Sequence, residues 1–339
     1  MAKATGAIKT GVIGAGRMGA GFHADHLART RKFELTAICD TDDAVLARAK
    51  RRFKVPTYAS LEEVLGQADV ELVVIATPTI LHAEQAMLAL RAGKHVVVEA
   101  PLCLTARDAD ALASATRQYR RKLAVFHRHR WDSDFLTLHK TLQSDKLGAV
   151  FALQRRVSVS ASAWAPATDS QTPWRLARAA GGGIGYDWGY HLVDQVLQLV
   201  PSEPEIIFGD AQARKLTTEV DDHFTCLIRF RNRTLALLEA SACARARAAS
   251  WSVLGTKGSL QGDERKLKGE AGRDAHAKEF VPRMAKGDPA GFYANLHKAI
   301  TTGEELEVTL GQARQVVLII EAAYRSSRIG CAVRLTGFE

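Results

Sequence analysis

A glycine-rich segment near the N-terminus has the residue types and spacing of a dinucleotide-binding turn. Gly14, Gly16 and Gly19 follow a continuous apolar run and precede a helical pattern. Gly14 permits a tight turn, Gly16 lets the backbone approach a pyrophosphate, and Gly19 lets the helix pack closely on the strand. Arg17 and Met18 complete the turn, and the N–H groups that begin the helix favour a diphosphate.

Asp40 ends the second apolar run, 21 residues beyond Gly19. Its carboxylate can accept hydrogen bonds from both hydroxyls of an adenosine ribose. Its charge would repel a 2′-phosphate, and Thr-Asp-Asp at positions 41–43 adds no arginine to bind one. The pattern therefore predicts NAD as cofactor, preferred over NADP. The alternative interpretation is a glycine turn beside a helix-capping aspartate, which leaves the complete fingerprint unexplained.

Two later segments add polar groups at the ends of predicted strands. Thr77 and Pro78 follow the fourth apolar run, and Glu99 and Ala100 end the fifth. Ligands of open α/β sheets bind where such strand ends meet, so we expect these residues and His82 to contact the cofactor. Glu99 ends a buried strand and needs a partner, which a nicotinamide ribose hydroxyl would supply. His82 could equally be a structural residue of the following helix.

The elements that must position these residues alternate in the first third of the chain. Apolar runs at 8–13, 35–39, 70–76, 95–99 and 123–126 predict strands, and 19–29, 43–53, 61–66, 80–92 and 105–121 predict helices. The runs are continuous, as expected for strands covered on both faces. This alternation indicates an α/β protein whose N-terminal domain is a doubly wound parallel Rossmann sheet.

The pattern changes near residue 130. A helix at 134–144 is followed by alternating segments at 150–160, 205–215, 224–230 and 234–240, which predict an open, mostly antiparallel sheet. Residues 255–259 read as a tight turn, 262–288 as a mobile polar loop, and 311–328 as a final helix. We therefore predict an NAD-binding domain at 1–128 and a substrate and oligomerisation domain, also α/β, at 129–339.

Composition narrows the class of protein. A hydrophobic fraction of 47% suits a globular chain, and no apolar run is long enough to predict a membrane span or a secretory signal. The five cysteines are scattered without a CxxC pair, which favours reduced thiols, a cytoplasmic location and no metal site. The net charge of +9 is spread along the chain, so we expect a small-molecule substrate and no nucleic-acid partner.

Taken together, the motifs resemble the Gfo/Idh/MocA family of NAD(P)-dependent oxidoreductases, over nearly the whole chain. The matching segments are GAGRMG (14–19), ATPTILH (76–82), GKHVVVEAP (93–101) and GGGIGYDWGYHLVD (181–194). Residues 126–137 and 220–224 look most like the branch containing scyllo-inositol dehydrogenases. The resemblance implies a Rossmann domain followed by an α/β domain, commonly assembled as a homodimer or homotetramer. The family has a glutamate-lysine-proline motif whose lysine is catalytic, and this sequence has Ala100 at the lysine position.

The resemblance maps the family's active-site aspartate and histidine onto Asp187 and His191. Asp187, His191 and Asp194 stand at i, i+4 and i+7, which predicts one stripe of a helix. An imidazole has a suitable pKa to exchange a hydroxyl proton, so our hypothesis is His191 as acid/base, oriented or tuned by Asp187. The alternative is a capping aspartate and a hydrogen-bonded core histidine.

Other candidates for substrate contacts carry weaker signals. Arg128 could recognise an anionic or polyol group or form a salt bridge, and Trp174 and Tyr186 could supply a sugar-stacking wall or belong to the core. Tyr293 occupies a position that resembles a family substrate contact, and Asp194 completes the stripe. His127 and His129 alternate along a strand end, so both could face one side near Asp132. Two such histidines could ligate zinc, but a third close ligand is not evident, so structural or substrate-contact roles are favoured.

The leading functional prediction is hydride transfer between NAD and a cyclic polyol, sugar or sugar derivative. The missing lysine keeps two alternatives open. NAD-dependent N-acetylgalactosaminidases of this fold have a small apolar residue at that position, so a redox-neutral glycosidase or lyase is one. A non-catalytic dinucleotide-binding protein is the other.

Overall fold

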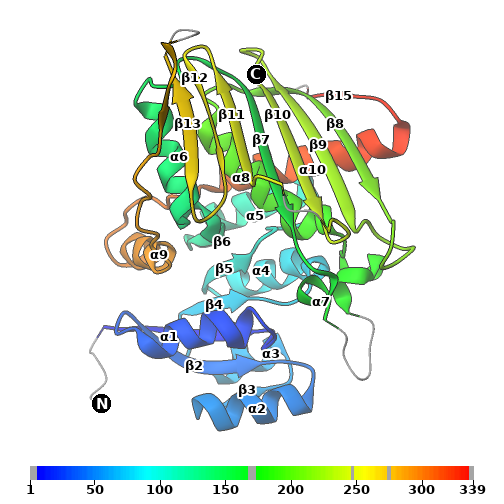
Figure 1. Ribbon diagram of the computed structural model, residues 1–339. Coiled ribbons are helices and arrows are strands. Elements are labelled where there is room, and N and C mark those ends of the chain that lie inside the picture. Colours follow the sequence, from blue (N-terminus) through cyan, green and yellow to red (C-terminus); the bar gives the residue numbers. More distant parts are fainter. Residues whose placement is uncertain (1–5, 167–172, 246–247, 273–275, 336–339) are drawn as a thin grey trace. The chain divides into compact units, whose positions relative to one another are not determined.

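The computed structural model describes residues 6–166, 173–245, 248–272 and 276–335 (Figure 1). By their contacts, these residues form two compact units. The first contains residues 6–126 together with Phe292–Arg314, and the second contains the described residues of His127–Gly291 and residues 315–335. The predicted boundary at 128/129 treats each domain as one continuous segment, whereas Phe292–Arg314 packs with the first unit although it comes late in the chain.

The first unit is built on a six-stranded parallel sheet in the order β3-β2-β1-β4-β5-β6. Its strands are β1 (Ile8–Ile13), β2 (Phe33–Cys39), β3 (Thr57–Tyr58), β4 (Leu72–Ile75), β5 (His95–Glu99) and β6 (Leu123–Phe126). Its helices are α1 (Asp25–Arg29), α2 (Asp43–Phe53), α3 (Leu61–Gln67), the 3₁₀ turn η2 (Thr79–Leu81), α4 (His82–Arg91) and α5 (Ala106–Tyr119). The predicted Rossmann sheet is confirmed, because this is the doubly wound strand order.

The strand order places the ends of β1 and β4 side by side at the point where the winding reverses. Loops that follow these neighbouring strands meet at the carboxyl edge of the sheet, which is where open α/β sheets bind ligands. The helix predicted over 19–29 is interrupted. It begins as a π-helical segment, η1 (Gly19–Ala24), and continues as α1. Ser60 and Thr105 cap α3 and α5 through their side-chain oxygens, in keeping with the sequence pattern.

The second unit contains a nine-stranded mixed sheet in the order β14-β13-β12-β11-β7-β10-β9-β8-β15. Its strands are β7 (Val150–Ser158), β8 (Pro204–Gln212), β9 (His223–Phe230), β10 (Leu235–Ser241), β11 (Trp251–Gly255), β12 (Gly258–Gly262), β13 (Leu267–Ala271), β14 (Lys278–Phe280) and β15 (Val333–Arg334). Only the β7–β10 pair is parallel among the strands described, so the predicted mostly antiparallel sheet is confirmed.

The helices of this unit before β8 are η3 (Arg128–Trp131), α6 (Ser133–Gln143), α7 (Ala161–Trp164), η4 (Trp174–Leu176), η5 (Arg178–Ala180), the π-helical η6 (Gly185–Gly189) and α8 (Tyr190–Leu199). Of these, η6 contacts β9 and β10. Helix α8 lies against β7 and β10 (Figure 1). Buried and exposed residues alternate along β9 and β10, which gives the sheet one core face and one outer face. Helices α9 (Gly291–Thr301) and α10 (Leu310–Ile329) follow β14, and β15 comes after α10.

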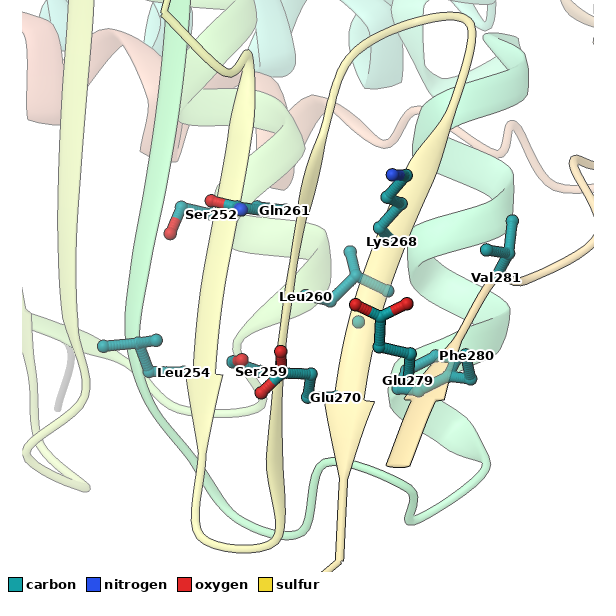
Figure 2. A pocket seen from close by; sticks show the side chains of 11 residues that line it. Ser252, Leu254, Ser259, Leu260, Gln261, Lys268, Glu270, Glu279, Phe280 and Val281 are labelled. Atoms are coloured by element: carbon teal, nitrogen blue, oxygen red, sulfur yellow. The ribbon is translucent and has the colours of Figure 1, made fainter. Parts of the chain in front are cut away.

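The prediction of a mobile loop over 262–288 is wrong for part of that segment. β13 and β14 lie within it and extend the sheet beyond β12. Their residues are polar on one face because that face is exposed, so composition alone suggested a loop. On β11–β14, eleven residues line a hollow of about 360 Å³ (Figure 2). None of the predicted site residues lines it.

Candidate active site

The three glycines of the first turn have different surroundings. Gly14 has φ +85°, and a Cβ there would lie 2.7 Å from the carbonyl oxygen of Ala76. A Cβ on Gly19 would lie 1.7 Å from the carbonyl oxygen of Gly14, which excludes any side chain. At exposed Gly16, a Cβ would meet nothing within 4 Å. The fold therefore requires Gly14 and Gly19, while Gly16 leaves open space through which a ligand can reach the backbone.

Asp40 lies directly beside this turn. Its Oδ2 accepts a hydrogen bond from the Ala15 N–H at 2.7 Å, and its Oδ1 accepts one from the Asp42 N–H at 3.0 Å. A carboxylate has about four acceptor positions, so two such bonds leave capacity for ribose hydroxyls. Arg17 is exposed and Met18 half-buried at the same turn. The open space at Gly16 and the fixed carboxylate together fit the adenosine diphosphate of a dinucleotide.

His82 joins the loops that follow β4 and β5. Its Nδ1 lies 2.7 Å from the carbonyl oxygen of Pro101, and its Nε2 lies 2.9 Å from that of Thr77. Burial lowers the pKa of His82, and these hydrogen bonds oppose only part of the shift. The Thr77 hydroxyl donates to Gln85 at 2.6 Å, and Pro78 is half-buried. These contacts connect the two loops through His82, and a contact of His82 with the cofactor stays a prediction.

A chain of three polar side chains begins at the end of β5. Glu99 Oε1 lies 2.8 Å from Nε2 of His23, and Nδ1 of His23 lies 2.6 Å from the hydroxyl of Tyr293. His23 and Tyr293 are fully buried, whereas the Glu99 side chain keeps 12% of its exposure. Burial, and next the charge of Glu99, raises the pKa of Tyr293 well above its usual value, so the phenol stays protonated. Half-buried Ala100 follows Glu99.

In the second unit, Asp187 lies in the π-helical segment η6. Its Oδ2 accepts a hydrogen bond from the Trp164 indole N–H at 2.9 Å and lies 3.2 Å from Nε of Arg175. Among the described residues, these are the contacts of the Asp187 carboxylate, and neither involves His191. The wider π turn alters the side-chain spacing that an α-helical stripe assumes. The hypothesis that Asp187 orients His191 therefore lacks a direct contact.

His191 follows at the start of α8 and is half-buried. Its Nδ1 is buried and has no hydrogen-bond partner within the described part of the chain. The ring of His129 meets it edge-on at 4.6 Å between centroids, and Nδ1 of His129 lies 2.5 Å from Asp132. Burial, followed by the positive charge of His129 and His127, lowers the pKa of His191 well below its usual value. The imidazole is thus neutral near pH 7 and able to accept a proton.

Asp194 takes part in a buried ion pair one turn further along α8. Arg130 donates to its two oxygens, from Nε at 2.9 Å and from Nη2 at 2.5 Å, and Nδ1 of His127 lies 3.7 Å away. Burial alone would raise the pKa of Asp194, but the charges of His127 and Arg130 outweigh it, so that pKa lies below its usual value. This arrangement lets Asp194 hold η3 against α8.

The remaining candidates are dispersed within their units. The ring of Tyr186 stacks on Tyr324 at 4.4 Å between centroids, and burial raises the pKa of Tyr186 to about 12. Trp174 is half-buried with the guanidinium of Arg175 over its ring at 4.3 Å, and Arg128 is half-buried in η3. Tyr293, predicted as a substrate contact, lies buried in the first unit against His23.

Sequence reasoning missed several residues at these sites. His23 stands four residues after Gly19, and a histidine on a helix that must face the sheet needs a polar partner, which was a usable signal. Trp164 and Arg175 gave no such signal, because each reaches Asp187 from a separate segment. Among the residues described, no group of three or more His, Cys, Asp or Glu side chains could hold a metal ion. In that same part of the chain, every helix is too short or too polar to span a membrane.

Comparison with known proteins gives two family matches along the chain. Residues 8–127 match the oxidoreductase family with an NAD-binding Rossmann fold, and residues 135–261 match the GFO/IDH/MocA C-terminal domain. The chain is 28% identical to scyllo-inositol 2-dehydrogenase (NADP(+)) IolW of Bacillus subtilis, over 95% of this chain and 94% of the relative. It is 30% identical to the uncharacterised oxidoreductase YdgJ of Escherichia coli, over 95% of this chain and 96% of the relative.

A solved structure and a partial match extend the comparison. The crystal structure of an NAD-binding protein from Listeria innocua superposes with a TM-score of 0.85 at 28% identity, covering 96% of both chains. A segment of 111 residues is 40% identical to glycosyl hydrolase family 109 protein 2 of a Shewanella species, covering 30% of this chain and 24% of the relative. With matches to both domain models and a near full-length relative at 30% identity, the chain belongs to the Gfo/Idh/MocA family of oxidoreductases.

Proposed function

We propose that this protein is an NAD-dependent dehydrogenase of a cyclic polyol, sugar or sugar derivative. The observation that carries the proposal is the open approach to the backbone at Gly16, beside a carboxylate fixed on the same turn. When bound, the dinucleotide supplies the carbon that accepts or donates hydride. The substrate class is supported by the relative whose name is scyllo-inositol 2-dehydrogenase.

The preference for NAD over NADP rests on charge. Asp40 is held against the glycine turn by the Ala15 N–H, where a 2′-phosphate on the ribose would meet its carboxylate. The next three residues add two further carboxylates and no arginine. The relative IolW carries NADP(+) in its name, so the cofactor preference of this chain is a specific point to measure.

His191 is the proposed proton acceptor for the substrate hydroxyl. Its neutral imidazole and its partnerless buried Nδ1 suit a group that meets its hydrogen-bond partner only when substrate is present. Asp187 would act on the site through Trp164 and Arg175, which it contacts directly. Arg128, Trp174 and Tyr186 stay predictions as substrate contacts.

The test is a coupled measurement of substrate and cofactor. Purified protein is incubated with NAD+ and a panel of inositols, pyranose sugars and their derivatives, and NADH and oxidised product are quantified together. The proposal expects one NADH for each substrate molecule oxidised, with NAD+ used more efficiently than NADP+. Binding of NAD+ without turnover across the panel would favour the non-catalytic alternative.

A second candidate is a redox-neutral, NAD-dependent glycosidase. It is favoured by Ala100 at the lysine position and by the partial match to a glycosyl hydrolase family 109 protein. Cleavage of aryl glycosides with no net NADH would support it over the dehydrogenase. The Ala100→Lys variant separates the two further, because a restored ammonium group should raise polyol oxidation by a dehydrogenase and should not aid a glycosidase.

Assembly and location complete the proposal. We infer a homodimer or homotetramer from the family resemblance and a cytoplasmic location from the scattered cysteines. Light scattering of the purified protein tests the first of these.

A further inference from the structure

The chain Glu99–His23–Tyr293 connects the end of β5 to a helix that begins 192 residues later, at Gly291. His23 is completely buried, and each of its ring nitrogens has a partner. One consistent pattern has the Tyr293 hydroxyl donating to Nδ1 of His23 and the Nε2–H of His23 donating to Glu99 Oε1. In this pattern the imidazole is neutral and the carboxylate is ionised.

The two carboxylate oxygens of Glu99 have different contacts. Oε1 is held by His23, while Oε2 receives a long hydrogen bond of 3.3 Å from the N–H of Ala100. The Glu99 side chain is partly exposed, whereas His23 and Tyr293 are fully buried. Ala100 offers no side-chain donor that could hold this carboxylate from the outer side.

The packing around His23 resists rotation of the ring. Phe126 meets it edge-on at 4.5 Å between centroids, and Tyr293 does so at 5.9 Å. The phenol ring of Tyr293 is itself stacked on His26 at 4.5 Å and packed edge-on against Phe33. The hydrogen-bonded chain is therefore held in one geometry by rings from four separate elements of the first unit.

We propose that His23 and Tyr293 are positioning residues that hold the Glu99 carboxylate as the hydrogen-bond acceptor for the nicotinamide ribose of the dinucleotide. This inference rests on the proposed function, because it assumes that the dinucleotide binds along the carboxyl edge of the first sheet. It replaces the predicted role of Tyr293 as a substrate contact with one that acts through His23. The adenosine end, held by Asp40 and the glycine turn, does not depend on it.

The experiment compares NAD+ with ADP, which lacks the nicotinamide ribose, by calorimetry. His23→Leu removes the donor to Glu99, His23→Gln keeps an N–H near the Nε2 position, and Tyr293→Phe removes only the hydroxyl. His26→Leu is the matched control, because His26 stacks on the same Tyr293 ring, whereas the histidine that contacts Glu99 is His23. Thermal melting of each variant without ligand reports its folding.

Loss of a hydrogen bond to a charged group corresponds to roughly a tenfold or greater loss of affinity. We expect His23→Leu to weaken NAD+ binding about tenfold and to leave ADP binding within about twofold. Tyr293→Phe should weaken NAD+ binding by a few fold, His23→Gln should recover most of the affinity, and His26→Leu should match the unaltered protein.

Three results would overturn the inference. Unchanged NAD+ affinity in both His23→Leu and Tyr293→Phe would remove the positioning role and leave the proposed function standing. Equal weakening of NAD+ binding and ADP binding would show that the hydrogen bonds among Glu99, His23 and Tyr293 only support the fold. Absence of NAD+ binding by the unaltered protein would overturn the cofactor assignment, and the positioning role with it. If His23→Leu does not fold, Tyr293→Phe decides the matter through the same NAD+ to ADP comparison.

Discussion

His23 in the first unit and His191 in the second have opposite hydrogen-bond environments. Both nitrogens of His23 are partnered by side chains of its own unit, and the ring is fully buried. His191 keeps partial exposure, and its buried Nδ1 lacks a partner in the described residues. A buried polar group normally has its partner within the fold, so the unmet nitrogen points to a group that binds from outside. The difference separates a histidine that holds another residue from one that can exchange a proton.

Removal of the proposed proton acceptor should have the largest effect on activity. His191→Asn should lower kcat with an active polyol at least a hundredfold, because general-base assistance is typically worth about 10²- to 10⁴-fold. NAD+ affinity should stay unchanged, as the cofactor's proposed contacts are in the other unit. His139→Asn on α6 is the control. Turnover of His191→Asn equal to that of the unaltered protein would end the assignment.

The glycine turn offers a matched pair of substitutions. Gly19→Ala would force a Cβ to within 1.7 Å of a carbonyl oxygen, so we expect a melting temperature lower by several degrees, from a cost of about 1–3 kcal/mol or more. Gly16→Ala meets open space in the protein, so it should melt normally and yet bind NAD+ at least tenfold more weakly. If Gly16→Ala binds NAD+ normally, the space at Gly16 is not the diphosphate site.

Asp40 is expected to determine the preference for NAD+ over NADP+. Asp40→Ser removes the charge that would repel a 2′-phosphate and keeps a hydroxyl near the ribose. We expect the NAD+ to NADP+ preference in kcat/KM to fall about tenfold, since one charge contact is worth about 1–2 kcal/mol. Asp42→Ser is the control beside it. A preference for NADP+ in the unaltered protein would contradict the charge argument.

The pH dependence carries the smallest expected effect. The pKa of His191 lies well below its usual value, so the base form persists as pH falls from 8 to 6 and is lost only below that range. A histidine with its ordinary pKa of about 6.5 would lose most of its base form by pH 6. We therefore expect kcat for oxidation to change less than about twofold over this window from this group. A steep fall of kcat centred near pH 6.5 would show that burial does not lower the pKa of His191 as its contacts indicate.

The glycine turn and the parallel sheet of the first unit could be predicted, because each depends on a pattern of residues that are near one another in sequence. Continuous apolar runs that alternate with helical patterns, and the spacing of the glycines after the first run, are local signals of a parallel sheet. Asp40 reaches the turn through a bond to Ala15, which lies on the adjacent strand's loop. The prediction of β-rich structure after residue 130 succeeded for the same reason, because β9 and β10 alternate visibly.

The side-chain contacts that join distant segments could not be predicted from the sequence. His23 and Tyr293 are 270 residues apart, and nothing in the sequence pairs them. Asp187 and His191 were expected on one α-helical stripe, but η6 is π-helical, and close approach of Gly185 and Gly189 to Phe224 accompanies that geometry. β13 and β14 were missed because exposed strands at a sheet edge have the composition of a loop.

The most direct test of the account follows the hydride itself. The protein is incubated with NAD+ and a polyol that it oxidises, deuterated at the ring carbons, and the reduced cofactor is analysed by mass spectrometry. We expect one deuterium in each NADH, in proportion to the oxidised product, and loss of that signal in His191→Asn. Cleavage or consumption of the substrate with no deuterium in a reduced cofactor would contradict it.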